Sequence, residues 1–182
     1  MVMEKPKLDL EQKYSSAATC VRKKTVKLSK ILVKYYAVEG DWVLDWGGGK
    51  YDTATEYLKE HGIVNVIYDP YNRSESENQI ALAKINYDFV MISNVLNVVA
   101  ERDVRLIMLD DAKKHLKKDG TLLVKVWEGD GTGVLKANEK KNSCQMNQPI
   151  GFYTSEIAAV FGMENTNIVK AEGCKIIEAI KR

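Results

Sequence analysis

The sequence predicts an α/β protein with a doubly wound, mostly parallel sheet. Short apolar runs typical of buried strands alternate along the chain with segments of helical periodicity. Because each parallel pair of strands needs a long crossover, this alternation predicts helices on both faces of the sheet. The last two strand-like runs, 166–171 and 174–180, flank a turn at Glu172-Gly173 and predict an antiparallel hairpin that closes the sheet.

Length and composition predict one folded domain. The chain has 182 residues, of which 45% are hydrophobic and 29% charged, and these values exclude a disordered or collagen-like protein. We expect residues 1–182 to form a single domain, with a basic helical segment at 1–38 and the α/β core at 39–182. The longest apolar stretch, 89–100, is too short to span a membrane, and the N-terminus lacks the apolar core of a secretory signal. We therefore expect a cytoplasmic protein without membrane contact.

Cysteine and histidine usage argues against a metal site. Cys20, Cys144 and Cys174 lie far apart without a CxxC pair, and the two histidines, His61 and His115, have no HExxH or HxH spacing. We expect reduced thiols and no bound metal.

The helices and strands are predicted in order from the apolar pattern. Strands are predicted at 42–46, 64–68, 87–92 and 121–127. Helices are predicted at 25–37, 102–117 and about 155–161. A further helix is predicted to begin at a capping box, Thr53-Ala54-Thr55-Glu56, and to end at about Glu60. Between the second and third of these strands, residues 72–86 are too weakly patterned for an assignment.

Positive charge is concentrated near the N-terminus, although the net charge is only +2. No acid occurs from Gln12 to Val38, and a helical wheel gathers the lysines of this stretch on one face. Such a face indicates contact with a nucleic-acid phosphate backbone, or else a solvated helix surface without a partner, which is the commoner case. The nucleic-acid-binding residues predicted on this basis are Arg22, Lys23, Lys27, Lys30 and Lys34.

A glycine loop, Gly47-Gly48-Gly49, follows the first strand and precedes a helix. Backbone N–H groups of such a loop bind anionic or nucleotide-like ligands. A dinucleotide fingerprint needs a small residue where the chain has Asp52, and a phosphate-binding P-loop needs different spacing and a Ser or Thr after Lys50. The remaining pattern, Asp45-x-Gly47-x-Gly49 with Asp69 at the end of the second strand, predicts an adenosine-containing ligand whose ribose hydroxyls bond a carboxylate.

Four motifs in order resemble class I S-adenosylmethionine-dependent methyltransferases. They are VLDWGGGKYDTATEYL, VIYDPYN, YDFVMISNVLNVV and LKKDGTLLVKVWEG, and they cover Trp42 to about Glu128. The resemblance implies a Rossmann-like seven-stranded sheet of order 3-2-1-4-5-7-6, with S-adenosylmethionine as the cofactor. The chain departs from the family at Tyr51, where many members have a third glycine, and in lacking a clear third motif.

The resemblance also implies roles for individual residues. In such enzymes the glycine loop passes the methionine part of the cofactor, Asp69 holds the ribose, and the residues after the third predicted strand line the cofactor opposite the substrate. The cofactor-binding residues expected on this basis are Asp45, Trp46, Gly47, Gly48, Gly49, Asp69, Pro70, Ser93, Asn94 and Val95. A narrower similarity, in SSAATCVRKKTVKLSKIL, YDPYN and SNVLNVV, is to methyltransferases associated with DNA phosphorothioation and to phage-type relatives, and it implies a nucleic-acid context.

The sequence leaves the methyl acceptor unassigned. Ser93-Asn94-Val95-Leu96 lacks the proline typical of exocyclic-amine methylation, and no cysteine follows a proline as in cytosine C5 methylation. Nucleic acid is slightly favoured, and the alternatives are a small-metabolite methyltransferase or a non-catalytic binding protein of this fold. If the acceptor must lose a proton, the candidate catalytic residues are Asn97, Glu128 and Tyr153. Asn97 is equally typical of a helix cap, and residues such as Glu128 and Tyr153 are more often surface residues than catalysts.

The polar segment Glu128–Pro149 is expected to be an irregular, mobile lid over the acceptor site. It leaves the carboxyl end of a strand, where ligands bind in parallel α/β sheets, and it contains glycines but no apolar stripe. The alternative is a surface excursion without function.

Overall fold

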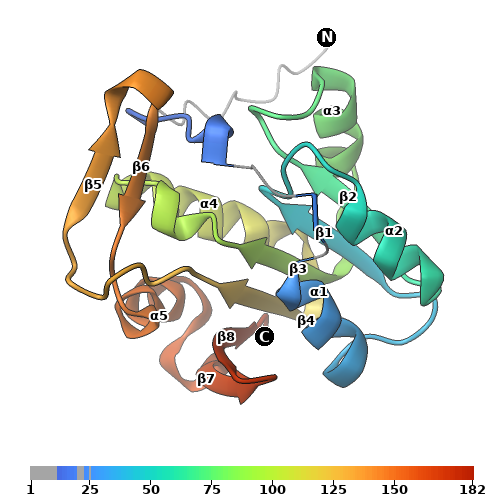
Figure 1. Cartoon of the computed structure of the whole chain (residues 1–182). Helices are drawn as coiled ribbons and strands as arrows, with labels where there is room; N and C mark the ends of the chain where they lie inside the picture. The colour runs from blue at the N-terminus through green and yellow to red at the C-terminus, as the bar shows by residue number, and fades with distance from the viewer. Residues whose placement is uncertain (1–11, 20–22, 25) are drawn as a thin grey trace, which may run out of the picture.

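The computed structural model describes residues 12–19, 23, 24 and 26–182 and has an α/β fold built on a six-stranded sheet (Figure 1). The strands are β1 (Trp42–Trp46), β2 (Val64–Tyr68), β3 (Tyr87–Ser93), β4 (Leu116–Lys125), β7 (Thr166–Ala171) and β8 (Cys174–Ile180). Their order is β2-β1-β3-β4-β8-β7, in which the first four are parallel and the last two form an antiparallel hairpin beside β4. The predicted mostly parallel sheet with an antiparallel end is confirmed.

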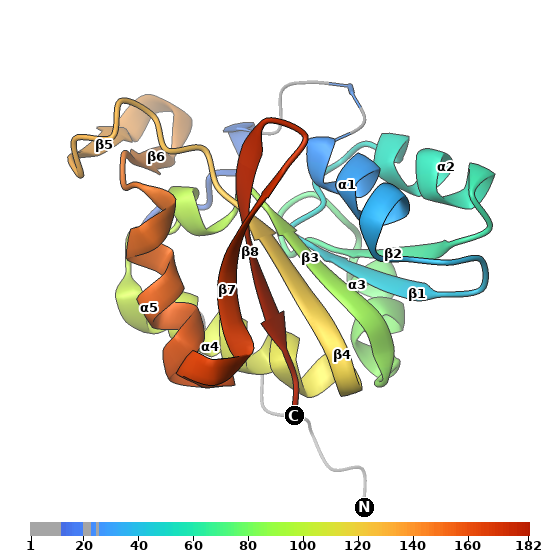
Figure 2. The ribbon, with the colours of Figure 1, turned by 90° about the horizontal axis from the view of Figure 1, so that it is seen from below.

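Helices cover both faces of the sheet (Figure 2). α1 (Lys27–Tyr35) and α2 (Thr53–Glu60) lie on one face, and α3 (Glu75–Ala83), α4 (Arg102–His115) and α5 (Ile150–Phe161) lie on the other. Consecutive residues of β1 alternate between the two hydrophobic cores, with Val43 packed on the α1 side and Leu44 on the α4 side. This arrangement places the carboxyl ends of the parallel strands together at one edge of the sheet.

The expectation of seven strands was wrong. The sheet of the described residues lacks the third strand of the expected order 3-2-1-4-5-7-6. Only residues 69–86 separate β2 from β3, and they form a loop and the single helix α3. A further parallel strand would need a second crossover of about a dozen residues or more, for which the chain has no length here. β2 is therefore an edge strand of the sheet.

The predicted capping box of α2 was also wrong. Thr53 and Glu56 both lie inside α2, and its N-cap is Asp52, whose side chain makes no capping hydrogen bond. Asp52 instead forms an ion pair with Arg73 at 2.8 Å. A capping box does occur at α3, where Ser74 Oγ accepts from the N–H of Glu77 and the Glu77 carboxylate accepts from the N–H of Ser74.

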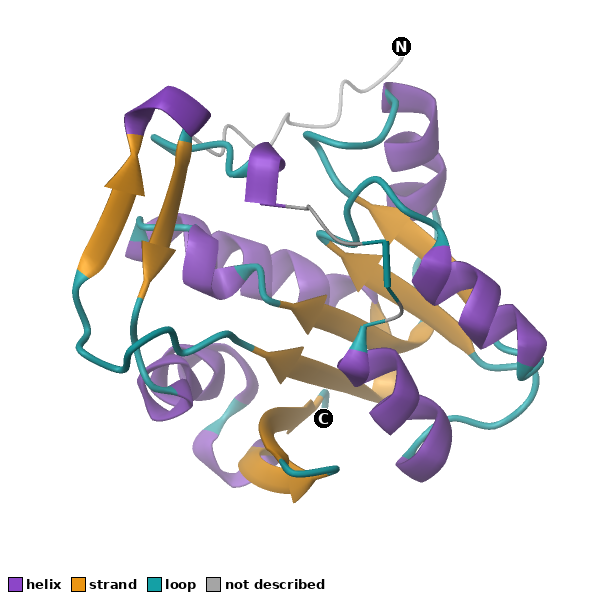
Figure 3. Cartoon of the chain, in the orientation of Figure 1, coloured by secondary structure: helices purple, strands orange, loops and turns teal. Residues whose placement is uncertain are grey.

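The segment Glu128–Pro149 is not the irregular loop that the sequence predicted. It contains an antiparallel hairpin of β5 (Leu135–Asn138) and β6 (Ser143–Met146), joined through a 3₁₀ turn at Glu139–Lys141 (Figure 3). β5 is exposed throughout, whereas three of the four β6 residues are buried. A single four-residue buried strand gives too short a pattern to be distinguished from a loop.

A buried ion pair connects α4 and α5. Arg105, which is 1% exposed, donates to both carboxylate oxygens of Glu156 at 2.8 and 2.6 Å. The same guanidinium donates to the backbone carbonyls of Val99 and Ala100, which precede α4. Arg105 thus fixes three segments of the chain around one buried charge.

The other element bounds agree with the sequence to different degrees. The predicted strands 42–46, 64–68, 166–171 and 174–180 match the structure residue for residue. The helix predicted at about 155–161 begins earlier, at Ile150, because Glu128 Oε1 accepts from the Ile150 N–H at 2.6 Å and caps it. Cys20, Arg22 and Thr25 lie outside the described residues. Within the described part of the chain, every helix is too short or too polar to span a bilayer.

Candidate active site

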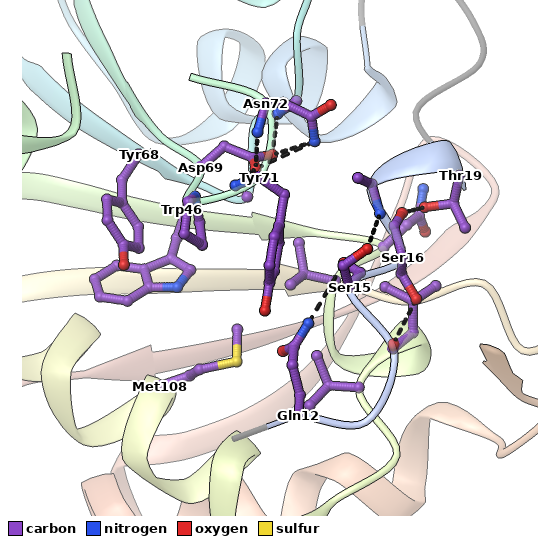
Figure 4. Close-up of a pocket in the computed structure, with 18 residues that line it drawn as sticks. Gln12, Ser15, Ser16, Thr19, Trp46, Tyr68, Asp69, Tyr71, Asn72 and Met108 are labelled. Carbon is purple, nitrogen blue, oxygen red and sulfur yellow. Dashed lines mark hydrogen bonds between the residues drawn. The ribbon is translucent and has the colours of Figure 1, made fainter. Parts of the chain in front are cut away.

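A cavity of about 270 Å³ lies at the carboxyl ends of β1, β2 and β3 (Figure 4). Ligands of doubly wound sheets bind outside these strand ends, where the strand order reverses. The lining residues come from the loops after these three strands, from α4 and from the segment before α1. They are Gln12, Ser15, Ser16, Ala17, Thr19, Trp46, Gly47, Gly49, Tyr68, Asp69, Pro70, Tyr71, Asn72, Asn94, Val95, Val98, Val99 and Met108.

The glycine loop brings backbone, rather than side chains, to the wall of the cavity. Gly47 has φ +75°, and its N–H donates to the Tyr68 carbonyl at 2.7 Å. A Cβ at Gly47 would lie 2.4 Å from Val95 Cγ2, so the positive φ and the close contact both require glycine. Gly48 lies behind the wall, where a Cβ would be 2.8 Å from the Asp45 carboxylate.

Asp69 organises the loop that follows β2. Its Oδ2 accepts from the Gly49 N–H at 2.9 Å, and its Oδ1 accepts from the N–H groups of Tyr71 and Asn72 at 3.0 Å each. The Asn72 side-chain amide adds two longer contacts, of 3.2 Å to each oxygen. Figure 4 shows this carboxylate on the cavity wall, with the Tyr71 ring standing between it and Gln12.

Asp45 lies close behind the glycine loop and is 2% exposed. Burial raises the pKa of its carboxyl to about 7, and the negative charge of Asp69 adds to the rise, while Arg73 opposes it. Asp45 does not line the cavity and lies behind Gly48, on the interior side of the loop.

Replacing Asp45 by asparagine is expected to stabilise the protein above neutral pH. The folded protein keeps a proton on Asp45 up to a pKa of about 7, whereas the unfolded chain releases it at the ordinary carboxyl pKa of about 3.8, so stability falls as pH rises between these two values. The difference between the folded and unfolded pKa values of Asp45 corresponds to a loss of at most about 4 kcal/mol in the free energy of unfolding. The midpoint temperatures of thermal unfolding of the wild type and Asp45→Asn should therefore coincide near pH 4, and by pH 8 that of Asp45→Asn should be the higher. Asp103→Asn, at an exposed position of α4, is the control, and a wild type that gains stability relative to Asp45→Asn as pH rises would contradict the prediction.

The segment after β3 forms the opposite wall. Asn94 has φ +58°, and its N–H donates to the Lys125 carbonyl at 2.7 Å, so the chain turns sharply as it leaves the sheet. Asn94 and Val95 line the cavity, whereas Ser93 points away from it, and its hydroxyl is buried without a hydrogen-bond partner in the structure. Of the ten expected cofactor-binding residues, all except Asp45, Gly48 and Ser93 line the cavity.

Sequence reasoning missed the segment Gln12–Thr19, which covers the cavity. Ser16 Oγ donates to the Val98 carbonyl at 3.0 Å, and the Ser16 N–H donates to the Asn142 carbonyl at 3.0 Å. Tyr14 is buried, and its hydroxyl donates to Glu139 at 2.5 Å. The segment is therefore held between the residues after β3 and the β5–β6 hairpin. Its small polar residues carry no periodic pattern, so no sequence signal for this role exists.

The three candidate catalytic residues lie outside the cavity lining. Asn97 is 1% exposed, and its amide donates to Gln145 at 2.9 Å. Glu128 caps α5, as described above. Tyr153 is fully buried beside Arg105, and burial raises the pKa of its hydroxyl to about 12. Asn97 and Glu128 are therefore engaged in hydrogen bonds within the fold, whereas the Tyr153 hydroxyl is buried without a hydrogen-bond partner in the structure.

The predicted nucleic-acid-binding lysines also lie away from the cavity. Lys27, Lys30 and Lys34 are exposed on α1, but Lys23 precedes the helix and does not continue its face. Lys34 Nζ lies 2.5 Å from Glu172, which neutralises part of the charge. None of these lysines lines the cavity.

The fold is that of solved S-adenosylmethionine-dependent methyltransferases. 1,6-Didemethyltoxoflavin-N1-methyltransferase from Burkholderia thailandensis, solved with 1,6-didemethyltoxoflavin and S-adenosylhomocysteine, matches 84% of this chain and 76% of its own, with a TM-score of 0.64 and 19% identity. An O-methyltransferase family protein from the same organism matches 85% of this chain and 55% of its own, with a TM-score of 0.55 and 12% identity. Phosphoethanolamine N-methyltransferase 2 from Haemonchus contortus, in complex with S-adenosylmethionine, matches 77% of this chain and 37% of its own, with a TM-score of 0.51 and 16% identity.

These similarities are in structure and not in sequence. No family model matches the chain, and no curated protein sequence matches it. The chain spans only about half the length of the O-methyltransferase family protein and about a third of the phosphoethanolamine enzyme. The expected relation to phosphorothioation-associated and phage-type methyltransferases is supported by none of these comparisons. What this chain shares with the solved structures is the Rossmann-like methyltransferase fold.

Proposed function

We propose that this protein is an S-adenosylmethionine-dependent methyltransferase that acts on a small molecule. The observation that supports the proposal is the convergence of three features on one cavity. The glycine loop after β1, the carboxylate after β2 and the Asn94-Val95 turn after β3 line it together, within the fold of known methyltransferases.

The residues present fit the cofactor. Gly47 and Gly49 bring backbone with positive φ, +75° and +76°, to the cavity wall, and Asp69 presents a carboxylate there. The two 3.2 Å contacts from Asn72 to Asp69 are the longest that the carboxylate makes, so ribose hydroxyls would replace these at the least cost. When bound, the cofactor supplies an electrophilic methyl group on a sulfonium.

The chain's own residues would contribute alignment and exclusion of water. Methyl transfer is an in-line displacement, for which holding the acceptor atom close and in line supplies a large part of the rate enhancement. Gln12–Thr19 and the apolar side chains of Val95, Val98 and Val99 line this space and would limit the access of water to a bound acceptor. Among the described lining residues Asp69 is the one that carries a carboxylate, so no second carboxylate lines the cavity to act as a general base.

Two observations favour a small acceptor over nucleic acid. The segment Gln12–Thr19 covers the cavity, and the basic face of α1 lies elsewhere. The names of two structurally similar enzymes also state small substrates, didemethyltoxoflavin and phosphoethanolamine.

Calorimetric titration with S-adenosylhomocysteine tests the proposal first. We expect saturable binding of this product and none of NAD, and absence of S-adenosylhomocysteine binding would overturn the proposal. Transfer of label from S-adenosylmethionine should then be measured against DNA, RNA and fractionated cell metabolites. We expect label in the metabolite fraction, unchanged in a Lys27→Gln/Lys30→Gln/Lys34→Gln variant. Label in DNA or RNA that this variant abolishes would establish the nucleic-acid alternative instead.

A further inference from the structure

One positively charged side chain stands beside the cavity at the carboxyl end of β4. Lys125 is the last residue of that strand, and its Nζ lies 3.4 Å from the Asn94 side-chain oxygen. Asn94 lines the cavity, and its N–H bonds to the Lys125 carbonyl at 2.7 Å. This backbone hydrogen bond fixes the position of the lysine relative to the cavity wall.

Lys125 lacks an acidic partner within ion-pair distance among the described residues. Lys136 of the β5–β6 hairpin, in contrast, pairs with Asp130 at 2.6 Å. Ser93, which is the register partner of Lys125 on β3, has a buried hydroxyl without a hydrogen-bond partner in the structure. The half-exposed Lys125 ammonium therefore has one long hydrogen bond, to Asn94, and beside it the Ser93 hydroxyl is a buried donor without an acceptor, which is uncommon in native proteins.

The charges around the cavity are separated in space. Asp69 is the one acid among the described lining residues and lies after β2, whereas Lys125 lies at the end of β4, with β1 and β3 between the two strands. Trp127, two residues after Lys125, is 61% exposed and offers an apolar surface at the same strand end. The β4 end therefore combines a cation with an exposed aromatic ring, which suits a small acid with an apolar body.

We propose that Lys125 binds a carboxylate or phosphate group of the methyl acceptor and so selects anionic small molecules. This inference rests on the proposed function, because it assigns the substrate class of the same site. The lysine acts as a binding residue that orients the acceptor and takes no part in bond breaking.

Simple anions can test this without knowledge of the natural acceptor. The protein loaded with S-adenosylhomocysteine should be titrated with benzoate, inorganic phosphate and the neutral isostere benzamide, with the amide NMR signals of Asn94 as the readout. We expect benzoate or phosphate to shift these signals and benzamide not to. Lys125→Gln should lower the affinity for the anion by about tenfold or more, which is the loss expected for one charge-assisted hydrogen bond. Lys118→Gln, at the exposed opposite end of β4, should leave anion binding unchanged.

The results separate this inference from the proposed function. Equal binding of benzoate and benzamide, or anion binding that survives Lys125→Gln, overturns the role of Lys125 alone. A Lys125→Gln variant with weakened affinity for S-adenosylhomocysteine and unchanged anion binding also overturns it, because the lysine would then serve the methionine carboxylate of the cofactor. Failure of the wild type to bind S-adenosylhomocysteine overturns the proposed function and this inference with it.

Discussion

Replacing Asp69 by alanine is expected to weaken binding of S-adenosylhomocysteine by about tenfold to hundredfold or more, measured by calorimetry. A charge-assisted hydrogen bond contributes about 1.5 to 3 kcal/mol, which corresponds to this range. The loss should lie at the upper end, because the same carboxylate also holds the N–H groups of Gly49, Tyr71 and Asn72. Removing it frees both the glycine loop and the loop after β2.

Two further variants identify the cause of that loss. Asp69→Asn keeps the shape but not the charge, and we expect an intermediate affinity. Asp52→Ala removes a mostly exposed carboxylate that pairs with Arg73 on the outer side of the same loop, and we expect a small effect. Thermal unfolding should show that Asp69→Ala still folds, because residue 69 lies outside both hydrophobic cores. An affinity for S-adenosylhomocysteine that Asp69→Ala leaves unchanged would refute the assignment of this carboxylate to the cofactor.

Glu156→Gln is expected to lower the free energy of unfolding by about 3 to 5 kcal/mol. The substitution leaves the Arg105 guanidinium without its bidentate carboxylate at a position that is 1% exposed. An unpaired buried charge costs far more than the pair contributes, because desolvation of the charge is no longer offset. Chemical denaturation monitored by circular dichroism gives the measurement.

The same carboxylate offers a matched control. Arg102 lies 3.9 Å from Glu156 but is 63% exposed, so Arg102→Gln should change stability by less than about 1 kcal/mol. The double variant Arg105→Met/Glu156→Leu, which removes both charges, should recover much of the loss. Equal effects of Glu156→Gln and Arg102→Gln would contradict the buried-charge explanation.

Local sequence patterns sufficed to place the six strands of the main sheet and seven of the eighteen residues that line the cavity. β2 was predicted to the residue because Val64–Tyr68 is an apolar run between Gly62 and Asp69-Pro70, which end it by turn chemistry. Gly47, Gly49, Asp69 and Asn94 line one cavity because each follows a parallel strand, and such strand ends meet at one edge.

The features that the sequence did not predict depend on contacts between distant residues. The hydrogen bond from Tyr14 to Glu139 joins residues 125 positions apart, and no local pattern encodes it. Glu128 was a reasonable catalytic candidate by position, but the fold brings the N–H of Ile150 to its carboxylate. The seventh strand was expected from resemblance alone, and the 18 residues from 69 to 86 have no length for it.

The cover of the cavity has a consequence for the order of folding. Gln12–Thr19 bonds to residues of the β5–β6 hairpin that are synthesised more than 120 positions later, at separations of 125 to 128. Closing so large a loop costs chain entropy before its contacts form, so these contacts are expected among the last to appear. A ligand that binds only the closed cavity would favour this final step by mass action. A nascent chain released before the hairpin is made would already contain the whole glycine loop and yet have no closed site.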